Sequence, residues 1–150
     1  MKESFLHIDE KKMREVARIL AETLTEKPGK AAQVIALHGE LGAGKTTFSK
    51  AFVRGLGSRA RVLSPTFVLM KRHELKTKHY NNVYHLDCYR VEGVEEIRIL
   101  NWTEIITNPK NIVLVEWPTR ITRMLPKKRT IVRLTHDTEK TRNCTIEFHA

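Results

Sequence analysis

The sequence predicts a single α/β domain over residues 1–150, with a mixed β-sheet flanked by helices. Three observations support this prediction. The chain has 150 residues, the usual size of one domain, and no repeat, low-complexity tract or linker divides it. Segments with helical periodicity alternate with short apolar runs of strand length. A glycine-rich loop joins the first of these apolar runs to the helix that follows it.

The first predicted element is a helix over residues 9–26. Its apolar residues recur at spacings of three and four and form one stripe. Asp9 is the expected N-cap, and Pro28-Gly29 is expected to end the helix. The residues of the stripe are Met13, Val16, Ala17, Leu20, Ala21 and Leu24.

The next two elements are a strand and a second helix. Residues 34–37 are a short apolar run without helical period, which stops at Gly39. Residues 45–56 return to helical spacing, and Gly57 is a typical residue for the end of a helix. A strand, a glycine loop and a helix in this order are typical of the opening of an α/β domain.

The middle of the chain is expected to contain a β-hairpin followed by helix. Residues 67–70 and 83–86 are β-prone runs, and the polar stretch from Lys71 to Asn82 is predicted to be a long, mobile hairpin tip. Residues 92–106 carry isoleucines, a leucine and a valine among glutamates, which predicts one amphipathic helix or two short ones.

The last part of the chain is predicted to be mainly strand. Residues 112–115 are the most apolar run of all, and Glu116 ends it. The segment between Pro118 and Pro126 is expected to be a loop. Residues 130–136 and 143–148 alternate in hydropathy, which predicts a closing antiparallel pair.

The composition excludes several classes of protein. No apolar run approaches the ~18 residues that a membrane-spanning helix requires. Cys88 and Cys144 are too few for a disulfide framework, so we interpret them as unrelated thiols and expect a cytoplasmic protein. The formal net charge is +10, and residues 120–150 carry eight basic and three acidic side chains. Such a surface attracts phosphate backbones, acidic proteins or anionic lipids, or is simply a solvated face.

The strongest motif is the segment from Gly39 to Thr46, GELGAGKT, which matches the P-loop pattern. Its glycines let the backbone curl so that successive N–H groups face phosphate oxygens. Lys45 would place its charge on the β- and γ-phosphates, and the Thr46 hydroxyl would ligate Mg²⁺. The sequence therefore predicts a P-loop NTPase domain. The chain lacks the Asn-Lys-x-Asp motif that reads guanine, which favours ATP over GTP.

Further candidates are side chains that would meet the phosphates from neighbouring segments. Asp87 and Glu116 each follow an apolar run, where P-loop proteins keep a metal-binding carboxylate. One would hold the metal and the other would orient or deprotonate the attacking water, and the sequence leaves these roles interchangeable. Either is alternatively a plain strand-end acid. Thr66 follows the P-loop helix, where switch threonines approach a γ-phosphate.

Four motifs in one order resemble the bacterial TsaE family, also called YjeE. They are HGELGAGKTTFSKAFVRGLG, SPTFVL, YHLDCYRVEGVEE and VLVEWP, within residues 34–118. The resemblance implies a small, slow ATPase that works with two partner proteins, TsaB and TsaD, to make threonylcarbamoyladenosine at position 37 of tRNA. In this family the ATP cycle resets or enables the partner enzyme. The chain departs from the family pattern at Cys88, where leucine is usual, and in IRILNW after VEGVEE.

The resemblance also implies roles for individual residues. Thr46 and Glu116 would hold Mg²⁺, Asp87 would be the second catalytic acid, and Thr66 would be the switch threonine. Glu10, at the start of the first helix, and Arg142, in the last strand region, would line the nucleotide pocket. The residues implied to hold the ATP phosphates are Leu41, Gly42, Ala43, Gly44, Lys45, Thr46 and Thr47.

Two other functions remain open for a short P-loop chain. A small-molecule kinase would need a lid helix with arginines and an acceptor pocket, and a nucleotide-switched RNA-binding or regulatory module would need no catalysis. The implied partners are TsaD-like and TsaB-like proteins. A basic cluster is expected to lie beside the nucleotide-binding edge and to face tRNA or an acidic partner. Its residues are Arg120, Arg123, Lys127, Lys128 and Arg129.

Overall fold

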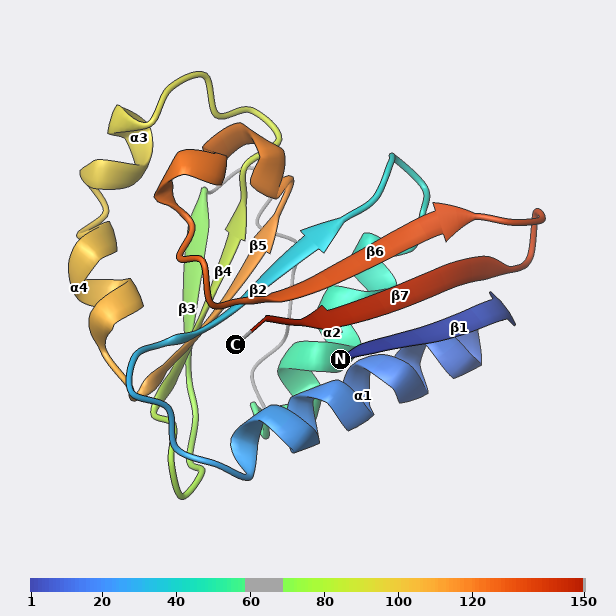
Figure 1. Ribbon diagram of the computed structural model, residues 1–150, viewed down its shortest axis with the longest axis horizontal. Coiled ribbons are helices and arrows are strands. Elements are labelled where there is room, and N and C mark those ends of the chain that lie inside the picture. Colours follow the sequence, from blue (N-terminus) through green and yellow to red (C-terminus); the bar gives the residue numbers. More distant parts are fainter. Residues whose placement is uncertain (59–68, 150) are drawn as a thin grey trace.

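Seven strands form one sheet in the computed structural model, which describes residues 1–58 and 69–149 (Figure 1). The strand order is β1-β7-β6-β2-β5-β4-β3. The central pairs β6–β2, β2–β5 and β5–β4 are parallel, and the pairs toward the edges are antiparallel. The predicted α/β class with a mixed sheet is therefore confirmed. The strands are β1 (Lys2–Ile8), β2 (Gln33–His38), β3 (Met70–Glu74), β4 (Asn82–Asp87), β5 (Asn111–Glu116), β6 (Thr130–His136) and β7 (Arg142–Phe148).

Two longer helices cover one face of the sheet, α1 (Glu10–Thr25) and α2 (Lys45–Gly55). The start of α1 is confirmed, because the Asp9 carboxylate accepts a hydrogen bond from the Lys12 backbone N–H at 2.8 Å. All six residues of its predicted apolar stripe are buried. Figure 1 shows α1 and α2 side by side, with α2 entering directly from the loop after β2.

The other face carries two short helices, α3 (Glu95–Arg98) and α4 (Trp102–Thr107), so the second of the two predicted alternatives is the one that forms. Strand β5 shows why the sheet needs cover on both sides. Its residues Ile112 and Leu114 join the core under α1 and α2, whereas Val113 and Val115 join the core under α4. A strand buried on both faces can present side chains to a ligand only where it ends.

Two elements differ from the sequence prediction. β1 was not predicted, because its residues are mostly exposed and show no alternation; it forms by antiparallel pairing with β7, a contact between distant parts of the chain. The segment after Pro118 was predicted to be a loop, but a 3₁₀ helix, η1 (Pro118–Met124), forms there. Pro118 stands in the first turn, where its missing N–H costs nothing.

A hairpin forms as the antiparallel pair β3–β4, with Met70 opposite Leu86. Its second strand matches the prediction, whereas the first begins only at Met70, and residues 67 and 68 of the predicted run lie outside the described residues. Its tip is shorter than predicted, because β3 extends through Glu74 into the polar stretch. The tip packs against the rest of the chain, and its predicted mobility stays a prediction. Tyr80 in the tip is fully buried, and its hydroxyl donates a hydrogen bond to the Lys27 carbonyl at 2.7 Å.

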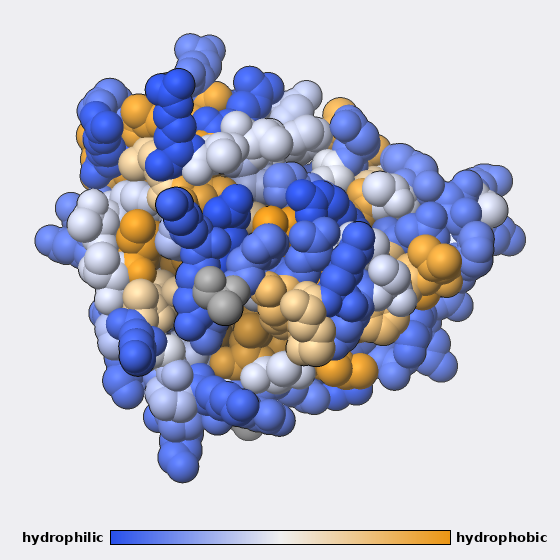
Figure 2. Space-filling view, in the orientation of Figure 1, coloured by the Kyte–Doolittle hydropathy of each residue, from blue (hydrophilic) through white to orange (hydrophobic). Residues whose placement is uncertain are grey.

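The surface in the view of Figure 2 is mainly hydrophilic, with an apolar area below its centre where α1 meets β1 and β7. A groove of about 380 Å³ lies between these elements, lined in part by Met1, Phe5, Ile19 and Phe148. Within residues 1–58 and 69–149, no helix has the length and apolar character needed to cross a bilayer.

Both cysteines are free and buried, and they lie in the two different cores, which confirms that the two thiols are unrelated. Burial raises the pKa of Cys88 and of Cys144 to about 12. Both thiols are therefore protonated and poorly reactive at neutral pH.

The close packing of α1 against α2 depends on Gly55. A Cβ added at Gly55 would lie 2.9 Å from the Ala21 Cβ and 3.1 Å from the Arg18 Cα. Gly55→Ala should lower the free energy of unfolding by about 1–2 kcal/mol, because overpacking outweighs the gain in helix propensity. Gly93→Ala is the matched control, since a Cβ there meets nothing within 4 Å. Urea unfolding of both variants measures the difference, and equal stabilities would contradict the tight contact.

Candidate functional site

The P-loop connects the carboxyl end of β2 to the first turn of α2. Gly42 and Gly44 adopt φ angles of 78° and 102°, in the left-handed region that favours glycine. Gly44 is also the N-cap of α2, and no side chain of the described residues caps the amides that follow it. The loop therefore leads to an uncapped helix N-terminus, which is the arrangement that binds phosphate groups.

The β6–β7 hairpin holds the P-loop from the outside. The His136 Nε2 donates to the Leu41 carbonyl at 3.2 Å. The Arg142 guanidinium donates to the Gly42 carbonyl at 3.0 and 3.2 Å, and to the Thr138 carbonyl in its own hairpin at 2.7 Å. Because the C=O and N–H groups of a trans peptide point in opposite directions, these contacts direct the N–H groups after Leu41 and Gly42 away from the hairpin.

Lys45 is almost completely buried, with 7% of its surface exposed. Its ammonium donates hydrogen bonds to the Gly39 carbonyl and, at 3.1 Å, to the Glu40 carbonyl. It also lies 4.2 Å from the ring centroid of Trp117, at a distance typical of a cation–π contact. Trp117 directly follows β5 and has a φ of 55°, a backbone conformation that is uncommon for a non-glycine residue.

Two effects of opposite sign act on the pKa of Lys45. Burial lowers the pKa of Lys45, whereas the negative charges of Glu116, Asp87 and Glu40 raise it and leave a smaller net decrease. The two acids predicted from the sequence therefore lie close enough to act on the P-loop lysine. The structure brings Lys45, Asp87 and Glu116 together at one edge of the sheet.

Asp87 and Glu116 stand directly opposite each other at the ends of β4 and β5. Glu116 is buried with 4% of its surface exposed, whereas Asp87 is half-buried. The Glu116 carboxylate accepts a hydrogen bond from His85 Nε2 at 2.7 Å. Asp87 instead accepts one from the Tyr89 backbone N–H at 3.0 Å. The two acids thus have different surroundings, which the sequence did not reveal.

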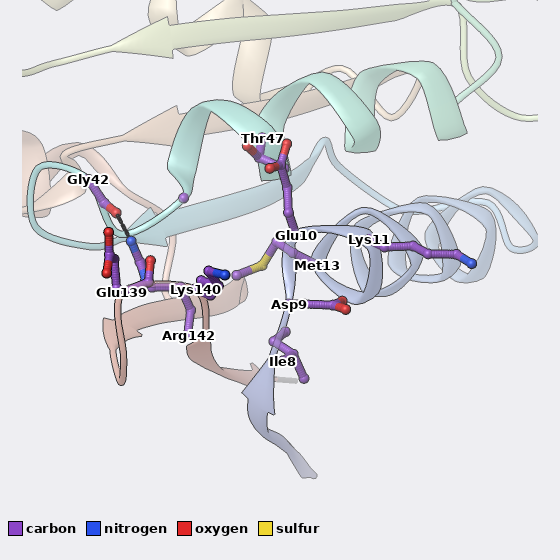
Figure 3. A pocket seen from close by; sticks show the side chains of 11 residues that line it. Ile8, Asp9, Glu10, Lys11, Met13, Gly42, Thr47, Glu139, Lys140 and Arg142 are labelled. Carbon is purple, nitrogen blue, oxygen red and sulfur yellow. Dashed lines mark hydrogen bonds between the residues drawn. The ribbon is translucent and has the colours of Figure 1, made fainter.

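A cavity of about 510 Å³ lies between the start of α1, the P-loop and the β6–β7 hairpin (Figure 3). Five of the residues predicted to bind nucleotide line it: Glu10, Gly42, Gly44, Thr47 and Arg142. Figure 3 shows the Arg142 side chain directed to the Gly42 carbonyl. The main contribution of Arg142 to this cavity is therefore to hold the P-loop backbone in place. The Glu10 carboxylate accepts a hydrogen bond from the exposed Arg14 at 2.8 Å.

The remaining predicted P-loop residues are distributed around the turn. Ala43 is buried, whereas Leu41 and Thr46 are exposed. Thr66 lies outside the described residues, so its predicted role as a switch threonine stays a prediction.

The predicted basic cluster does not lie at one place. Arg120 and Arg123 are exposed on η1, which follows the carboxyl end of β5 and therefore lies on the side of the P-loop. Lys127, Lys128 and Arg129 precede β6, which is parallel to β2, so they lie toward the opposite ends of these strands. The expectation that all five residues lie beside the nucleotide-binding edge is wrong, because the chain crosses the sheet between them.

The glycine-rich loop is closely packed where it leaves β2. A Cβ at Gly39 would lie 3.1 Å from the Leu134 carbonyl oxygen and 3.2 Å from the Ala43 Cβ, so the loop leaves no room for a side chain there. Among the described residues, no three His, Cys, Asp or Glu side chains form a metal-ligating group. A cation held by Thr46 and Glu116 would complete its shell with nucleotide oxygens and water, as Mg²⁺ commonly does.

Comparison with known proteins decides the family. The model of the family described as "Threonylcarbamoyl adenosine biosynthesis protein TsaE" matches residues 7–144. The chain belongs to the TsaE family. A TsaE protein of Rickettsia felis is 33% identical over 139 residues, which cover 92% of this chain and 75% of the relative. One of Haemophilus influenzae is 32% identical over 121 residues, covering 81% and 72%. Both are named tRNA threonylcarbamoyladenosine biosynthesis protein TsaE.

A solved structure agrees with the family assignment. The crystal structure of YdiB from a Bacillus species matches with a TM-score of 0.73 and 25% identity, and covers 100% of this chain and 87% of that chain. The family resemblance stated from four sequence motifs is thus confirmed, and so is the α/β fold over the whole chain.

Sequence reasoning missed two histidines of this site. His136 contacts the P-loop across the sheet, and no local pattern in the sequence indicates that contact. His85 had a usable signal, because it stands two positions before Asp87 and strand alternation places both on one face. Trp117, which directly follows Glu116, contacts Lys45 from a left-handed backbone conformation that no local pattern in the sequence indicates.

Removal of the Arg142 side chain should loosen the P-loop. Arg142→Ala deletes both bonds to the Gly42 carbonyl, and hydrogen bonds from charged donors are worth about 1.5–3 kcal/mol. Hydrogen exchange of the Ala43 amide, which donates to the Glu40 carbonyl at 3.0 Å, should therefore become about tenfold faster or more. Arg133→Ala is the matched control, because Arg133 pairs with Glu147 and does not contact the P-loop. Mass-spectrometric exchange measures the effect, and unchanged protection in Arg142→Ala would refute the role of the hairpin.

Proposed function

We propose that this chain binds ATP with Mg²⁺ and hydrolyses it slowly, in support of threonylcarbamoyladenosine synthesis on tRNA. The observation that carries the proposal is the convergence of Lys45, Asp87 and Glu116 beside an uncapped helix N-terminus. Membership of the TsaE family supplies the biosynthetic setting, because the family is described by its part in threonylcarbamoyl adenosine biosynthesis.

The residues divide the work as follows. The first-turn amides of α2 and the Lys45 ammonium bind phosphate oxygens, and Lys45 must first release the carbonyls of Gly39 and Glu40. Thr46 and Glu116 hold Mg²⁺, and the metal supplies neutralisation of the phosphate charge. Asp87, the more accessible acid, accepts a hydrogen bond from the attacking water and orients it.

The buried position of Lys45 helps to explain a slow reaction. Its ammonium is already satisfied by two carbonyls and the Trp117 ring, so every productive contact with a phosphate replaces an existing one. Binding energy spent on this exchange is not available to lower the barrier. A protein contact that displaced Trp117 would remove one of these three contacts, which suits a subunit whose ATP cycle is controlled by other proteins.

TsaD-like and TsaB-like proteins are the proposed partners, with contact to tRNA through basic residues as an additional element. Arg120 and Arg123 are best placed for this contact, because both are exposed on η1, which begins directly after Trp117. A partner or a tRNA phosphate bound to η1 would lie close to Trp117, the residue whose ring covers Lys45.

Lys45→Ala tests the proposed activity. The variant should keep its fold, because His136 and Arg142 still hold the loop from the β6–β7 hairpin. Its ATP hydrolysis should fall about 10²–10³-fold through loss of a charge on the transferred phosphate. Lys50→Ala, five positions further along α2, is the control and should keep wild-type activity. Phosphate release without any acceptor measures the rate and also separates an ATPase from a kinase. Hydrolysis at the wild-type rate in Lys45→Ala would contradict the proposal.

Charge reversal tests the proposed contact with tRNA. Arg120→Glu with Arg123→Glu should weaken tRNA binding by the assembly with both partners. The slope of log affinity against log salt should flatten by about 0.7–0.9 for each tRNA phosphate that the variant no longer neutralises. Lys127→Glu with Lys128→Glu is the matched control at the other end of the strands. If wild type and the Arg120/Arg123 variant show the same tRNA affinity at every salt concentration, η1 is a solvated surface that does not contact tRNA.

A further inference from the structure

His85 and Glu116 form a buried pair that no predicted role includes. Their side chains are 1% and 5% exposed, and the Nε2–Oε2 distance is 2.7 Å. His85 is opposite Leu114 in the β4–β5 ladder, so its ring reaches diagonally to the next residue on the same face of β5. Among the described residues, His85 is the only hydrogen-bond partner of the Glu116 carboxylate.

The direction of this hydrogen bond follows from the chemistry of the pair. A carboxylate accepts, so the Nε2 of His85 carries the hydrogen. One oxygen of Glu116 is thereby engaged, and the rotation of the carboxylate is restricted. The second oxygen, Oε1, has no partner among the described side chains and is available for a cation.

The restricted rotation of the Glu116 carboxylate is important because Asp87 lies beside it. Asp87 is directly opposite Glu116, and like charges directly opposite each other on neighbouring strands destabilise the pair. Two adjacent acids with free rotation could exchange their roles at the metal. The hydrogen bond from His85 acts on Glu116 alone, whereas Asp87 is held by the Tyr89 N–H.

We propose that His85 is a positioning residue that orients Glu116 as the metal-holding carboxylate and so leaves Asp87 free for the water. The inference rests on the proposed function and deepens it. Hydrogen-bond partners of metal ligands commonly set ligand orientation, and their loss typically weakens metal binding about 10–100-fold. A purely structural residue at this buried place would be expected to be apolar, since the Nδ1 of His85 has no hydrogen-bond partner among the described residues.

A second buried histidine provides an internal control. His73 on β3 is 8% exposed, and its Nε2 likewise lacks a partner among the described residues. It lies on the same face of the sheet as His85, because His73 is opposite Val83 in the β3–β4 ladder. Burial, and after it the neighbouring His85, lower the pKa of His73. The described contacts of Glu116 do not include His73. Replacement of His73 therefore perturbs the same core without touching the carboxylate.

The test compares two amide variants of matched polarity. In His85→Gln the side-chain nitrogen replaces Nε2 and can still donate to Glu116, whereas in His85→Asn it replaces Nδ1 and is too short to reach. The measurement is the affinity for ATP in Mg²⁺ divided by the affinity for ATP in EDTA, here called the magnesium gain. Calorimetric titration gives both affinities, and thermal unfolding without ligand reports stability.

The inference predicts that His85→Asn loses about 10–100-fold of the magnesium gain, while its ATP affinity in EDTA stays near that of wild type. His85→Gln and His73→Asn should keep the gain within about threefold of wild type, on the same premise. Glu116→Gln should resemble His85→Asn. Asp87→Asn should keep the gain but lower turnover, because a water-orienting group acts mainly in the transition state.

Two results would overturn the inference. Equal magnesium gains in His85→Asn and His85→Gln would make His85 a packing residue, and so would a fall of both affinities in parallel with stability. Failure of the proposed function gives a different pattern, in which wild type itself shows no magnesium gain and Lys45→Ala binds ATP as wild type does. That pattern would remove the basis of the inference as well.

Discussion

Two carboxylates that face each other across neighbouring strands are the constraint around which this site is built. Asp87 and Glu116 end β4 and β5 in register, so their charges are held close by the backbone ladder itself. The surroundings compensate them with the Lys45 ammonium, the His85 N–H and the Tyr89 N–H. The structure thereby keeps both acids at one edge while giving each a distinct environment.

The P-loop is shaped by parts of the chain that are far from it in sequence. Arg142 and His136, from β7 and β6, hold carbonyls of the loop, and Trp117, after β5, covers its lysine. Each of these residues acts through the position of a strand in the sheet. The glycine-rich motif supplies conformational freedom, and the surrounding sheet selects one conformation from it.

The parts of the structure that depend on neighbouring residues were predictable. The α1 stripe, its Asp9 cap, the loop and helix that contain Lys45, and the acids at the ends of two apolar runs all follow from spacing along the chain. Contacts between distant segments were not predictable, because no local pattern encodes them. The pairing of β1 with β7 is one example, and the contact of Arg142 with Gly42 is another. The predicted position of the basic cluster was wrong for the same reason, since the chain crosses the sheet between Arg123 and Lys127.

The pairing of β1 with β7 also bears on how the chain folds as it is made. Lys2 lies opposite Glu147, so β1 is synthesised well before its partner strand and remains unpaired until β7 has been made. The helix α1 packs in the same core as β7, and its apolar stripe is only partly covered in the interval. Closure of the sheet is therefore a late step with a large separation along the chain, of the kind that slows folding. During translation, this edge is where we expect a chaperone to find exposed apolar surface.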